Sequence, residues 1–238
     1  MPENRFFINK PLEIGSEYRL EEEESLHFSR SMRGKKGQKV EIINGKGSLA
    51  HATVVQTDKK GTLIHVDDIV HEKAQGPCIH LIQAIPKINR LDIILEKGTE
   101  LGMSDIYLFP GDLSEKKQFS HLQKERMERI LINATKQCGR LYVPTVHFKP
   151  SLDQWLRDDL PAPAFFGDVR EKAPLLKDAL KEASTLSFVI GPEAGFSKRE
   201  IEKLESLGAK GVSLHHNILK ADTAPLAALA IVSHLLMK

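Results

Sequence analysis

The pattern of apolar residues changes at Pro77, and this change most limits the folds open to the chain. Before Pro77, short apolar runs are separated by turn residues such as Asn44–Gly47. The runs are Val40–Ile43, Ala50–Gln56 and Thr62–Val66. This spacing predicts a small β-barrel or sandwich. The polar segment His71–Pro77 resembles a linker, so we expect two domains, residues 1–72 and residues 73–238.

After Pro77, apolar runs alternate with stretches of helical period. The first run is Ile79–Ile85, and Pro86 then opens a helix that ends near Gly102. Further strands are expected at Ile106–Phe109, Val143–Phe148, Ala164–Phe166, Leu186–Ile190 and Gly211–Leu214. Further helices are expected at Leu122–Cys138, Ser151–Asp159, Glu171–Ala183, Lys198–Leu207 and from about Pro225 onward. This alternation predicts an α/β domain with a mainly parallel sheet covered on both faces.

The composition narrows the class of protein. The 34 Lys and Arg residues nearly balance the 32 Asp and Glu residues, which gives a formal net charge of +2. Two cysteines, Cys78 and Cys138, cannot build a disulfide framework and fit a reducing compartment. No apolar run approaches the ~20 residues of a membrane span, and Met1–Arg5 does not resemble a signal peptide. We therefore expect a cytoplasmic protein without a membrane partner.

Basic residues are concentrated in two segments despite the near-neutral total. The first follows the acidic run Glu21–Glu24 and contains Arg30, Arg33, Lys35, Lys36 and Lys39. The second contains Lys116, Lys117, Lys124, Arg126, Arg129, Lys136 and Arg140, opposed only by Glu125 and Glu128. Each segment alone is equally well explained as a solvated face. Two of them on one near-neutral chain favour a polyanion-binding surface, with Arg30, Arg33, Lys35, Lys36, Lys116 and Lys117 as candidates.

Several well-known site motifs are absent. The segment Gly45–Ser48 lacks the upstream glycine and the strand-loop-helix frame of a phosphate loop. The chain has no G-x-S-x-G and no C-x-x-C motif. The adjacent His215 and His216 cannot share one helix face as ligands, so we expect no metal site.

A glycine-bounded loop, Gly191–Phe196, follows the expected strand Leu186–Ile190. Ser197 and Glu200 then form a capping-box pattern, which marks the start of a helix. Loops at the carboxyl ends of parallel strands are where α/β sheets bind ligands. A tight strand-to-helix turn without a ligand explains the shape of this loop equally well.

A second unusual segment is Leu214–Pro225, which links the last expected strand to the last helix. Asp222 or Thr223 can cap that helix, with Pro225 in its first turn. Lys220 lies just before the helix start, where bound anions are favoured. A plain helix cap with a surface lysine is the alternative, and it leaves residues 214–221 unexplained.

Ordered motifs across nearly the whole chain resemble the bacterial ribosomal small-subunit RNA methyltransferase E family, a branch of the knotted SPOUT methyltransferases. The matching residues are Arg30–Arg33 with Gly37, Lys97 with Glu100–Gly102, Gln137–Arg140 with Pro144, Gly191–Gly195, and Leu219–Ala224. The resemblance implies an N-terminal PUA-like β-barrel that binds RNA and a C-terminal SPOUT α/β domain with a trefoil knot. It also implies homodimers and methyl transfer from S-adenosylmethionine to N3 of a uridine in 16S rRNA.

The resemblance further implies which residues hold the cofactor, mainly through the backbone of the loop at Gly191 and the loops after it. They are Phe166, Gly167, Ile190, Gly191, Pro192, Glu193, Gly195, Leu214, Asn217, Ile218, Leu219 and Thr223. The chain departs from the family pattern at Ala194, His215 and Asn217, and it has Lys220 and Asp222 where the family has Arg and Glu. We therefore expect weaker or altered cofactor binding.

The chemistry of N3 methylation suggests roles for three residues. Uridine N3 carries a proton, which a base must remove or cations must help to release. We assign Asp222 the role of orienting group or base, and Lys220 or Arg140 the stabilisation of charge on O2 or O4. Two alternatives remain open: a SPOUT 2′-O-methyltransferase acting on ribose, and a non-catalytic RNA-binding protein with a degenerate cofactor pocket.

Overall fold

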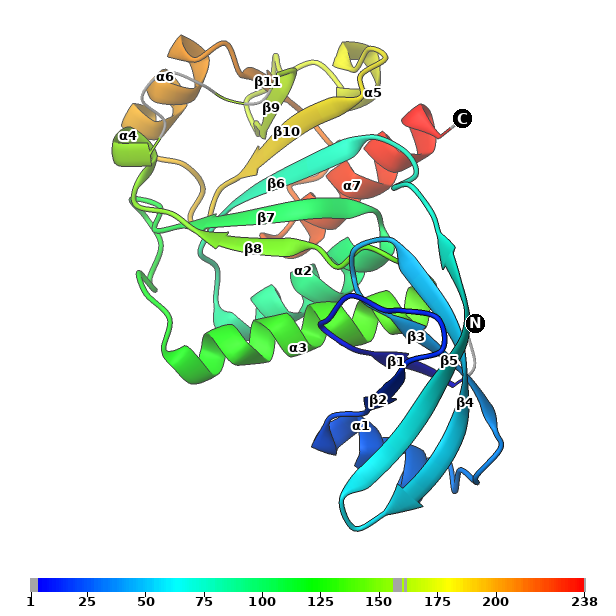
Figure 1. Ribbon diagram of the computed structural model, residues 1–238. Coiled ribbons are helices and arrows are strands. Elements are labelled where there is room, and N and C mark those ends of the chain that lie inside the picture. The colour runs from blue at the N-terminus through cyan, green and yellow to red at the C-terminus, as the bar shows by residue number, and fades with distance from the viewer. Residues whose placement is uncertain (1–3, 156–159, 161, 238) are drawn as a thin grey trace. The chain divides into compact units, whose positions relative to one another are not determined.

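The computed structural model describes residues 4–155, 160 and 162–237 (Figure 1). The chain divides into two compact units. The N-terminal unit holds the residues up to Gln75 together with Ile132–Val143, and the C-terminal unit holds Gly76–Leu131 and the residues from Pro144 onward. Within the described ranges, no helix is both long and apolar enough to cross a membrane.

The N-terminal unit is built on a five-stranded sheet in the order β1-β3-β4-β5-β2. Its elements are β1 (Arg5–Phe7), β2 (Glu17–Arg19), α1 (Glu22–Leu26), the π-helical turn η1 (His27–Ser31), β3 (Lys39–Ile43), β4 (Ser48–Asp58) and β5 (Gly61–His71). Strand β1 runs parallel to β3, and the other pairs are antiparallel. The three expected strands are confirmed as β3, β4 and β5, whereas β1, β2, α1 and η1 were not predicted.

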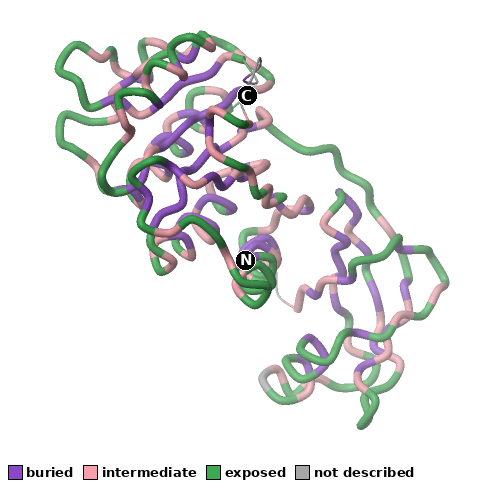
Figure 2. Tube along the Cα trace, turned by 90° about the vertical axis from the view of Figure 1, so that its left-hand side faces the viewer, coloured by how far each residue is buried: buried purple, intermediate pink, exposed green. Residues whose placement is uncertain are grey.

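Alternation of buried and exposed residues along β3–β5 places one face of this sheet in a core (Figure 2). Phe6 of β1 meets Phe28 of η1 edge to face, with ring centroids 5.9 Å apart. Gly34 lies directly against the Phe28 ring, where a Cβ would come within 2.1 Å of the ring carbon Cζ. The close approach requires glycine and holds the chain between η1 and β3 against the core.

The two-unit division differs from the expected boundary because residues 132–143 join the N-terminal unit. Lys136 Nζ lies 2.6 Å from Oε1 of Glu24, which is buried. The N–H of Val143 donates to the carbonyl of Gly45, and the Tyr142 hydroxyl donates to the carbonyl of Glu72. These contacts join residues far apart in sequence, so local pattern could not predict them.

The C-terminal unit contains a six-stranded parallel sheet in the order β11-β9-β10-β6-β7-β8. Its strands are β6 (Cys78–Ala84), β7 (Met103–Phe109), β8 (Thr145–Phe148), β9 (Ala164–Gly167), β10 (Thr185–Ile190) and β11 (Lys210–Val212). Its helices are α2 (Ile88–Glu100), α4 (Leu152–Trp155), α5 (Leu176–Ala179), α6 (Lys198–Ser206) and α7 (Thr223–Leu236), and α3 (His121–Cys138) contributes to both units. The expected α/β class with a parallel sheet is confirmed.

Helices cover both faces of this sheet (Figure 1). On one face, α4 and α6 pack through Leu152 and Leu204 onto a core that includes Ile82, Phe109 and Phe166. On the other face, α7 contacts β6 and β10 while α2 contacts β7 and α7. Burial on both faces explains why the central strands consist of continuous apolar runs.

Two expected helices differ from the structure. The helix expected over Glu171–Ala183 is wrong, because only Leu176–Ala179 is helical. Pro174 cannot donate a helical hydrogen bond, and the next residue, Leu175, pairs with Ser213 instead. The helix expected over Ser151–Asp159 is observed as Leu152–Trp155, and residues 156–159 lie outside the described residues.

Candidate cofactor pocket and RNA-contacting segments

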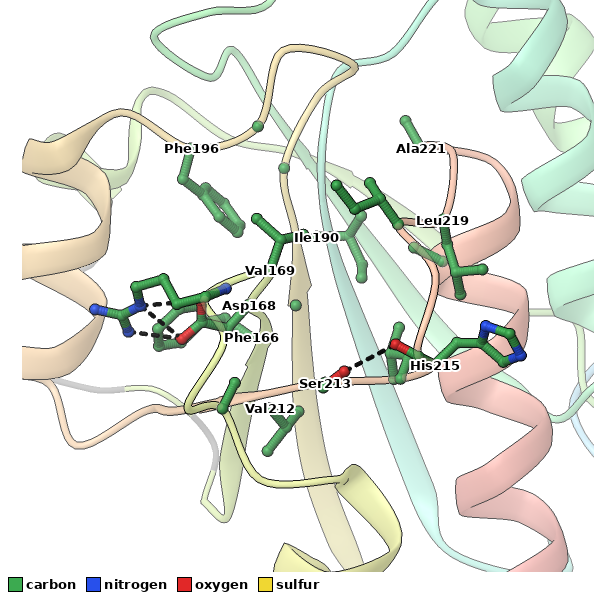
Figure 3. Close-up of a pocket in the computed structure, with 18 of the residues that line it drawn as sticks. Phe166, Asp168, Val169, Ile190, Phe196, Val212, Ser213, His215, Leu219 and Ala221 are labelled. Carbon is green, nitrogen blue, oxygen red and sulfur yellow. Dashed lines mark hydrogen bonds and ion pairs between the residues drawn. The ribbon is translucent and has the colours of Figure 1, made fainter.

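A pocket of about 820 Å³ opens at the carboxyl ends of β9, β10 and β11 (Figure 3). Its walls are the three loops that follow these strands, residues 167–175, 191–196 and 213–221. Parallel strands end at one edge of a sheet, so these loops converge there. The volume falls within the range of about 300–1,000 Å³ that is usual for small-molecule sites.

All the predicted cofactor-binding residues except Thr223 line this pocket. They are Phe166, Gly167, Ile190, Gly191, Pro192, Glu193, Gly195, Leu214, Asn217, Ile218 and Leu219. Thr223 is the first residue of α7 and is exposed. The lining also contains residues that the sequence analysis did not select, among them Arg90, Asp168, Val169, Arg170, Phe196, Val212, Ser213 and His215.

The inner wall of the pocket is apolar. Ile190 and Val212 are the last residues of β10 and β11, Phe166 is the last but one of β9, and all three are buried. Phe196 meets Phe166 edge to face, with ring centroids 6.1 Å apart (Figure 3). Among the described residues, the backbone N–H groups of Ile218 and Leu219 have no acceptor in the protein. Apolar walls combined with unpaired backbone donors suit a flat, partly polar ring such as a purine.

The loop Gly191–Gly195 is tightly folded. The N–H of Gly195 donates to the carbonyl of Pro192 at 2.9 Å, and a Cβ on Gly191 would lie 3.1 Å from the Gly195 carbonyl carbon. Ala194 takes the place of a family glycine without strain, because it is not among the residues with positive φ. Gln83 of β6 is fully buried, and its Nε2 donates to the Gly191 carbonyl at 3.3 Å. This hydrogen bond attaches the loop to the neighbouring strand β6.

Arg90 of α2 connects two acidic residues at the pocket. Its Nε lies 3.4 Å from Glu193 Oε1, and its Nη1 lies 3.8 Å from Asp222 Oδ1. The N–H of Lys87 also donates to Glu193 Oε1 at 3.1 Å. Sequence reasoning missed Arg90, because its acidic partners lie more than a hundred residues away.

Of the three candidate catalytic residues, Lys220 alone belongs to the pocket lining in the described chain. Lys220 lines the pocket and is exposed, with no ion-pair partner among the described residues. Asp222 is the N-cap residue of α7, one of the two positions expected. Its side chain makes no capping hydrogen bond, and its carboxylate faces Arg90 instead. Arg140 belongs to the N-terminal unit and is outside the pocket lining. Burial lowers the pKa of Arg140. Its catalytic role stays a prediction.

An ion pair closes the loop after β9. Both carboxylate oxygens of Asp168 accept hydrogen bonds from Arg170 Nε, at 2.9 and 2.8 Å. Arg170 also donates to Glu205, and its hydrogen bonds to Asp168 and Glu205 raise the pKa of Arg170. A Cβ on Gly211 of β11 would lie 2.3 Å from Asp168 Oδ2. The buried Asp168 carboxylate therefore depends on glycine in the neighbouring strand.

His215 stabilises the turn in the loop after β11. The Ser213 hydroxyl donates to the His215 carbonyl at 3.0 Å (Figure 3). The N–H of Asn217 donates to His215 Nδ1, also at 3.0 Å. The departures at His215 and Asn217 thus form a local hydrogen-bonded turn in place of the family's glycine and arginine.

The two basic segments differ in how many of their charged side chains already have partners within the protein. Arg30, Arg33, Lys35 and Lys36 are exposed and have no acidic partner among the described residues. In the second segment, Lys117 Nζ donates to the carbonyls of Gly111 and Asp112, and Lys116 lies 5.5 Å from the Phe119 ring centroid. The remaining cations there include Arg126, paired with Asp92, and Lys136, paired with Glu24. The first segment therefore offers the freer charges.

Comparison with known proteins agrees with this architecture. The model of the RNA methyltransferase domain matches residues 74–233, and that of the RNA methyltransferase PUA domain matches residues 20–66. Ribosomal RNA small subunit methyltransferase E of Aquifex aeolicus is 30% identical over 219 residues, covering 90% of this chain and 92% of that protein.

Solved structures show the same fold. Ribosomal RNA small subunit methyltransferase E of Neisseria gonorrhoeae, bound to S-adenosylmethionine, is 26% identical with a TM-score of 0.88, covering 99% of this chain and 98% of that one. A methyltransferase of Legionella pneumophila in complex with S-adenosylmethionine superposes with a TM-score of 0.91 at 24% identity, covering 99% of this chain and 98% of that one.

Proposed function

The chain belongs to the ribosomal RNA small subunit methyltransferase E family, and on this premise we propose that it transfers a methyl group from S-adenosylmethionine to N3 of a uridine in 16S rRNA. The observation that carries the proposal is the pocket at the carboxyl ends of β9–β11, with Lys220 and the Arg90–Asp222 pair beside it. The trefoil knot stays a prediction.

The pocket fits S-adenosylmethionine. Phe166, Ile190 and Val212 would give the adenine an apolar surface, and the N–H groups of Ile218 and Leu219 would give donors to its polar edge. Glu193, which lines the pocket, would interact with a positively charged group of the ligand. When bound, S-adenosylmethionine supplies a methyl group on a sulfonium sulfur. That sulfur leaves as a neutral thioether and needs no help from an acid.

The chain's own residues then have to position the uridine and move its N3 proton. The ion pair with Arg90, at 3.8 Å, favours this position of the Asp222 carboxylate, and the carboxylate orients the uracil base or accepts its proton. Lys220 is two residues before Asp222 and lines the pocket. Its ammonium group can therefore stabilise the negative charge that develops on O2 or O4 of the uridine. A paired N3 is blocked, so the target uridine must be unpaired or flipped out.

We assign the RNA contacts first to Arg30, Arg33, Lys35 and Lys36, and then to Lys116 and Lys117. The first four are exposed and free of acidic partners in the described chain. Such cations bind phosphates and provide affinity with little sequence reading. An enzyme acting on ribosomal RNA works in the cytoplasm, where the two unpaired cysteines also fit.

We also propose a homodimer. Two large apolar side chains remain exposed at the end of α7, with exposed fractions of 48% for Leu235 and 70% for Met237. Neighbouring exposed apolar side chains are typical of an interface. Light scattering on the wild type and on Leu235→Glu tests this; the variant is expected to be monomeric.

Methyl transfer from labelled S-adenosylmethionine to small ribosomal subunits tests the function. Lys220→Ala and Asp222→Asn are each expected to lower turnover by about 10²-fold or more, as is usual for proton-transfer and charge-stabilising groups. Lys210→Ala is the control, because Lys210 is an exposed lysine on β11 outside the pocket lining. Wild-type turnover in both pocket variants would remove these residues from the mechanism. Absence of cofactor binding by calorimetry would favour a non-catalytic RNA-binding protein.

A further inference from the structure

A second polar cluster lies at the opposite edge of the parallel sheet from the pocket. Cys78 and His80 lie on β6, Asp105 on β7 and His147 on β8, each in the first three residues of its strand. His80 is the register partner of Asp105, and alternate residues of a strand share a face. The sequence analysis treated Cys78 as isolated, because the strand pairing that brings Asp105 to it is not local.

The donor atoms of this cluster converge. Cys78 Sγ is 3.5 Å from His80 Nε2, and His80 Nδ1 is 3.0 Å from Asp105 Oδ2. One ligand atom from each of the three residues lies within 4.8 Å of the others. His147 Nε2 is 3.2 Å from the second carboxylate oxygen, Asp105 Oδ1. Within the described chain, no lysine or arginine forms an ion pair with Asp105.

We infer that Cys78, His80 and Asp105 form a binding site for Zn²⁺, with the fourth position open to water. Thiolate, imidazole and carboxylate are the ligand types of zinc sites. Bonds of about 2.3 Å to sulfur and about 2.0 Å to nitrogen in a tetrahedron separate these atoms by roughly 3.5 Å. The observed Sγ–Nε2 distance of 3.5 Å equals one edge of that tetrahedron.

The charge balance also favours a cation. A thiol and a carboxylate stand together at a half-buried site, and no lysine or arginine among the described residues forms an ion pair with either. A divalent ion would neutralise the carboxylate of Asp105 and the deprotonated thiol of Cys78. His147, bonded to the free carboxylate oxygen, would orient Asp105 from outside the site.

The same three residue types could instead form a thiol–imidazole–carboxylate relay with a reactive Cys78. A relay needs an aligned hydrogen bond from His80 Nδ1 to the carboxylate. His80 Nδ1 is buried and has no hydrogen-bond partner in the described structure, although Asp105 Oδ2 is only 3.0 Å away. Without that hydrogen bond, the relay lacks the contact that would orient its imidazole. In the zinc site, His80 would bind the ion through Nε2, the ring nitrogen next to Cys78 Sγ, and Nδ1 would stay outside the coordination sphere. The zinc site would link β6 and β7 far from the methyl-transfer pocket and so stabilise the fold.

Cobalt titration of the untagged, chelator-treated and reduced full chain tests the site. We expect one Co²⁺ per chain with visible bands of tetrahedral cobalt and a thiolate-to-cobalt charge-transfer band, and we expect Zn²⁺ to displace the cobalt. Cys78→Ser should remove the charge-transfer band and His80→Ala should weaken binding at least tenfold. The control is Cys138→Ser, which should behave as wild type because Cys138 is exposed and belongs to the N-terminal unit.

A thermal-shift measurement separates metal binding from a folding defect, because each variant is compared with itself in the presence and absence of Zn²⁺. Zn²⁺ should raise the Tm of the wild type and of Cys138→Ser but not that of Cys78→Ser. A charge-transfer band that survives in Cys78→Ser, or the absence of tetrahedral cobalt bands in the wild type, would overturn the site. Alkylation of Cys78 far faster than Cys138 in a chain that binds no metal would identify the relay instead. Neither measurement depends on methyl transfer.

Discussion

The guanidinium of Arg90 lies 3.8 Å from the carboxylate of Asp222, joining the start of α2 to the start of α7 beside the pocket. The same guanidinium reaches Glu193 in the loop after β10. Arg90 thus holds together two segments that the resemblance alone treats as separate motifs.

Arg90→Ala should lower turnover because the Asp222 carboxylate loses the contact that directs it. Small misplacements of reacting groups cost up to about 10²-fold in rate, so we expect a fall of about 10- to 100-fold. Arg90→Lys should recover only part of it, since lysine lacks the planar fork that reaches both acids. Steady-state kinetics measure the effect. Arg126→Ala, which breaks an exposed pair with Asp92, is the control, and equal turnover in both variants would contradict the role of Arg90.

Gln83→Leu should weaken cofactor binding with only a small fall in Tm. The substitution removes the Nε2 that donates to the carbonyls of Gly191 and Ala84, but it also removes a buried Oε1 that has no partner in the described structure. Each lost hydrogen bond costs about 1 kcal/mol, and the removal of an unpaired buried oxygen offsets part of that cost. Calorimetry with S-adenosylmethionine measures the affinity. Ser187→Ala removes another unpartnered buried oxygen, outside the pocket lining, and should leave the affinity unchanged.

Asp112 should make stability depend on pH in acid. Hydrogen bonds from Arg199 and Ser197 lower the pKa of Asp112 and join the loop after β7 to the start of α6. A carboxyl group with a lowered folded pKa stabilises the fold above its unfolded value of about 3.9, and the contribution is lost as the pH falls through the folded pKa. Asp112→Asn should therefore be less stable than wild type at neutral pH, and the difference should shrink below about pH 4.

Urea unfolding at a series of pH values measures this difference in free energy of unfolding. Asp178→Asn serves as control, because Asp178 is exposed and has no ion pair in the described chain. A difference between Asp112→Asn and wild type that stays constant down to the lowest pH would show that the Asp112 ion pair is not the cause.

Replacing Arg30, Arg33, Lys35 and Lys36 by alanine should weaken RNA binding and reduce its salt dependence. Each phosphate contact to single-stranded nucleic acid contributes about 0.7 to the slope of log K against log salt concentration. Loss of four contacts should lower the magnitude of that slope by about 3. Lys59→Ala with Lys60→Ala, at the exposed β4–β5 turn, controls for total charge. An unchanged slope in the fourfold variant would place the RNA elsewhere.

Local pattern was sufficient for much of the fold. Short apolar runs between turn residues identified β3–β5, and continuous apolar runs identified the parallel strands. The capping box of Ser197 and Glu200 is present with both hydrogen bonds, so the start of α6 was predictable to the residue. The pocket loops were predictable because a parallel sheet must end its strands at one edge.

The features that sequence reasoning missed depend on contacts between distant residues. Lys136 joins the N-terminal unit through Glu24, Arg90 acquires its partners only in the folded chain, and Cys78 meets Asp105 across a strand pair. Pro174 carried a local signal against the helix expected over Glu171–Ala183, and it deserved more weight than the apolar spacing.

Nucleoside mass spectrometry of 16S rRNA from a strain that lacks this chain tests the central claim most directly. We predict that 3-methyluridine is absent from that rRNA, returns with the wild-type chain, and does not return with Asp222→Asn. If that rRNA instead lacks a 2′-O-methylated nucleoside and keeps its 3-methyluridine, the account is contradicted, and the chain methylates a ribose 2′-hydroxyl.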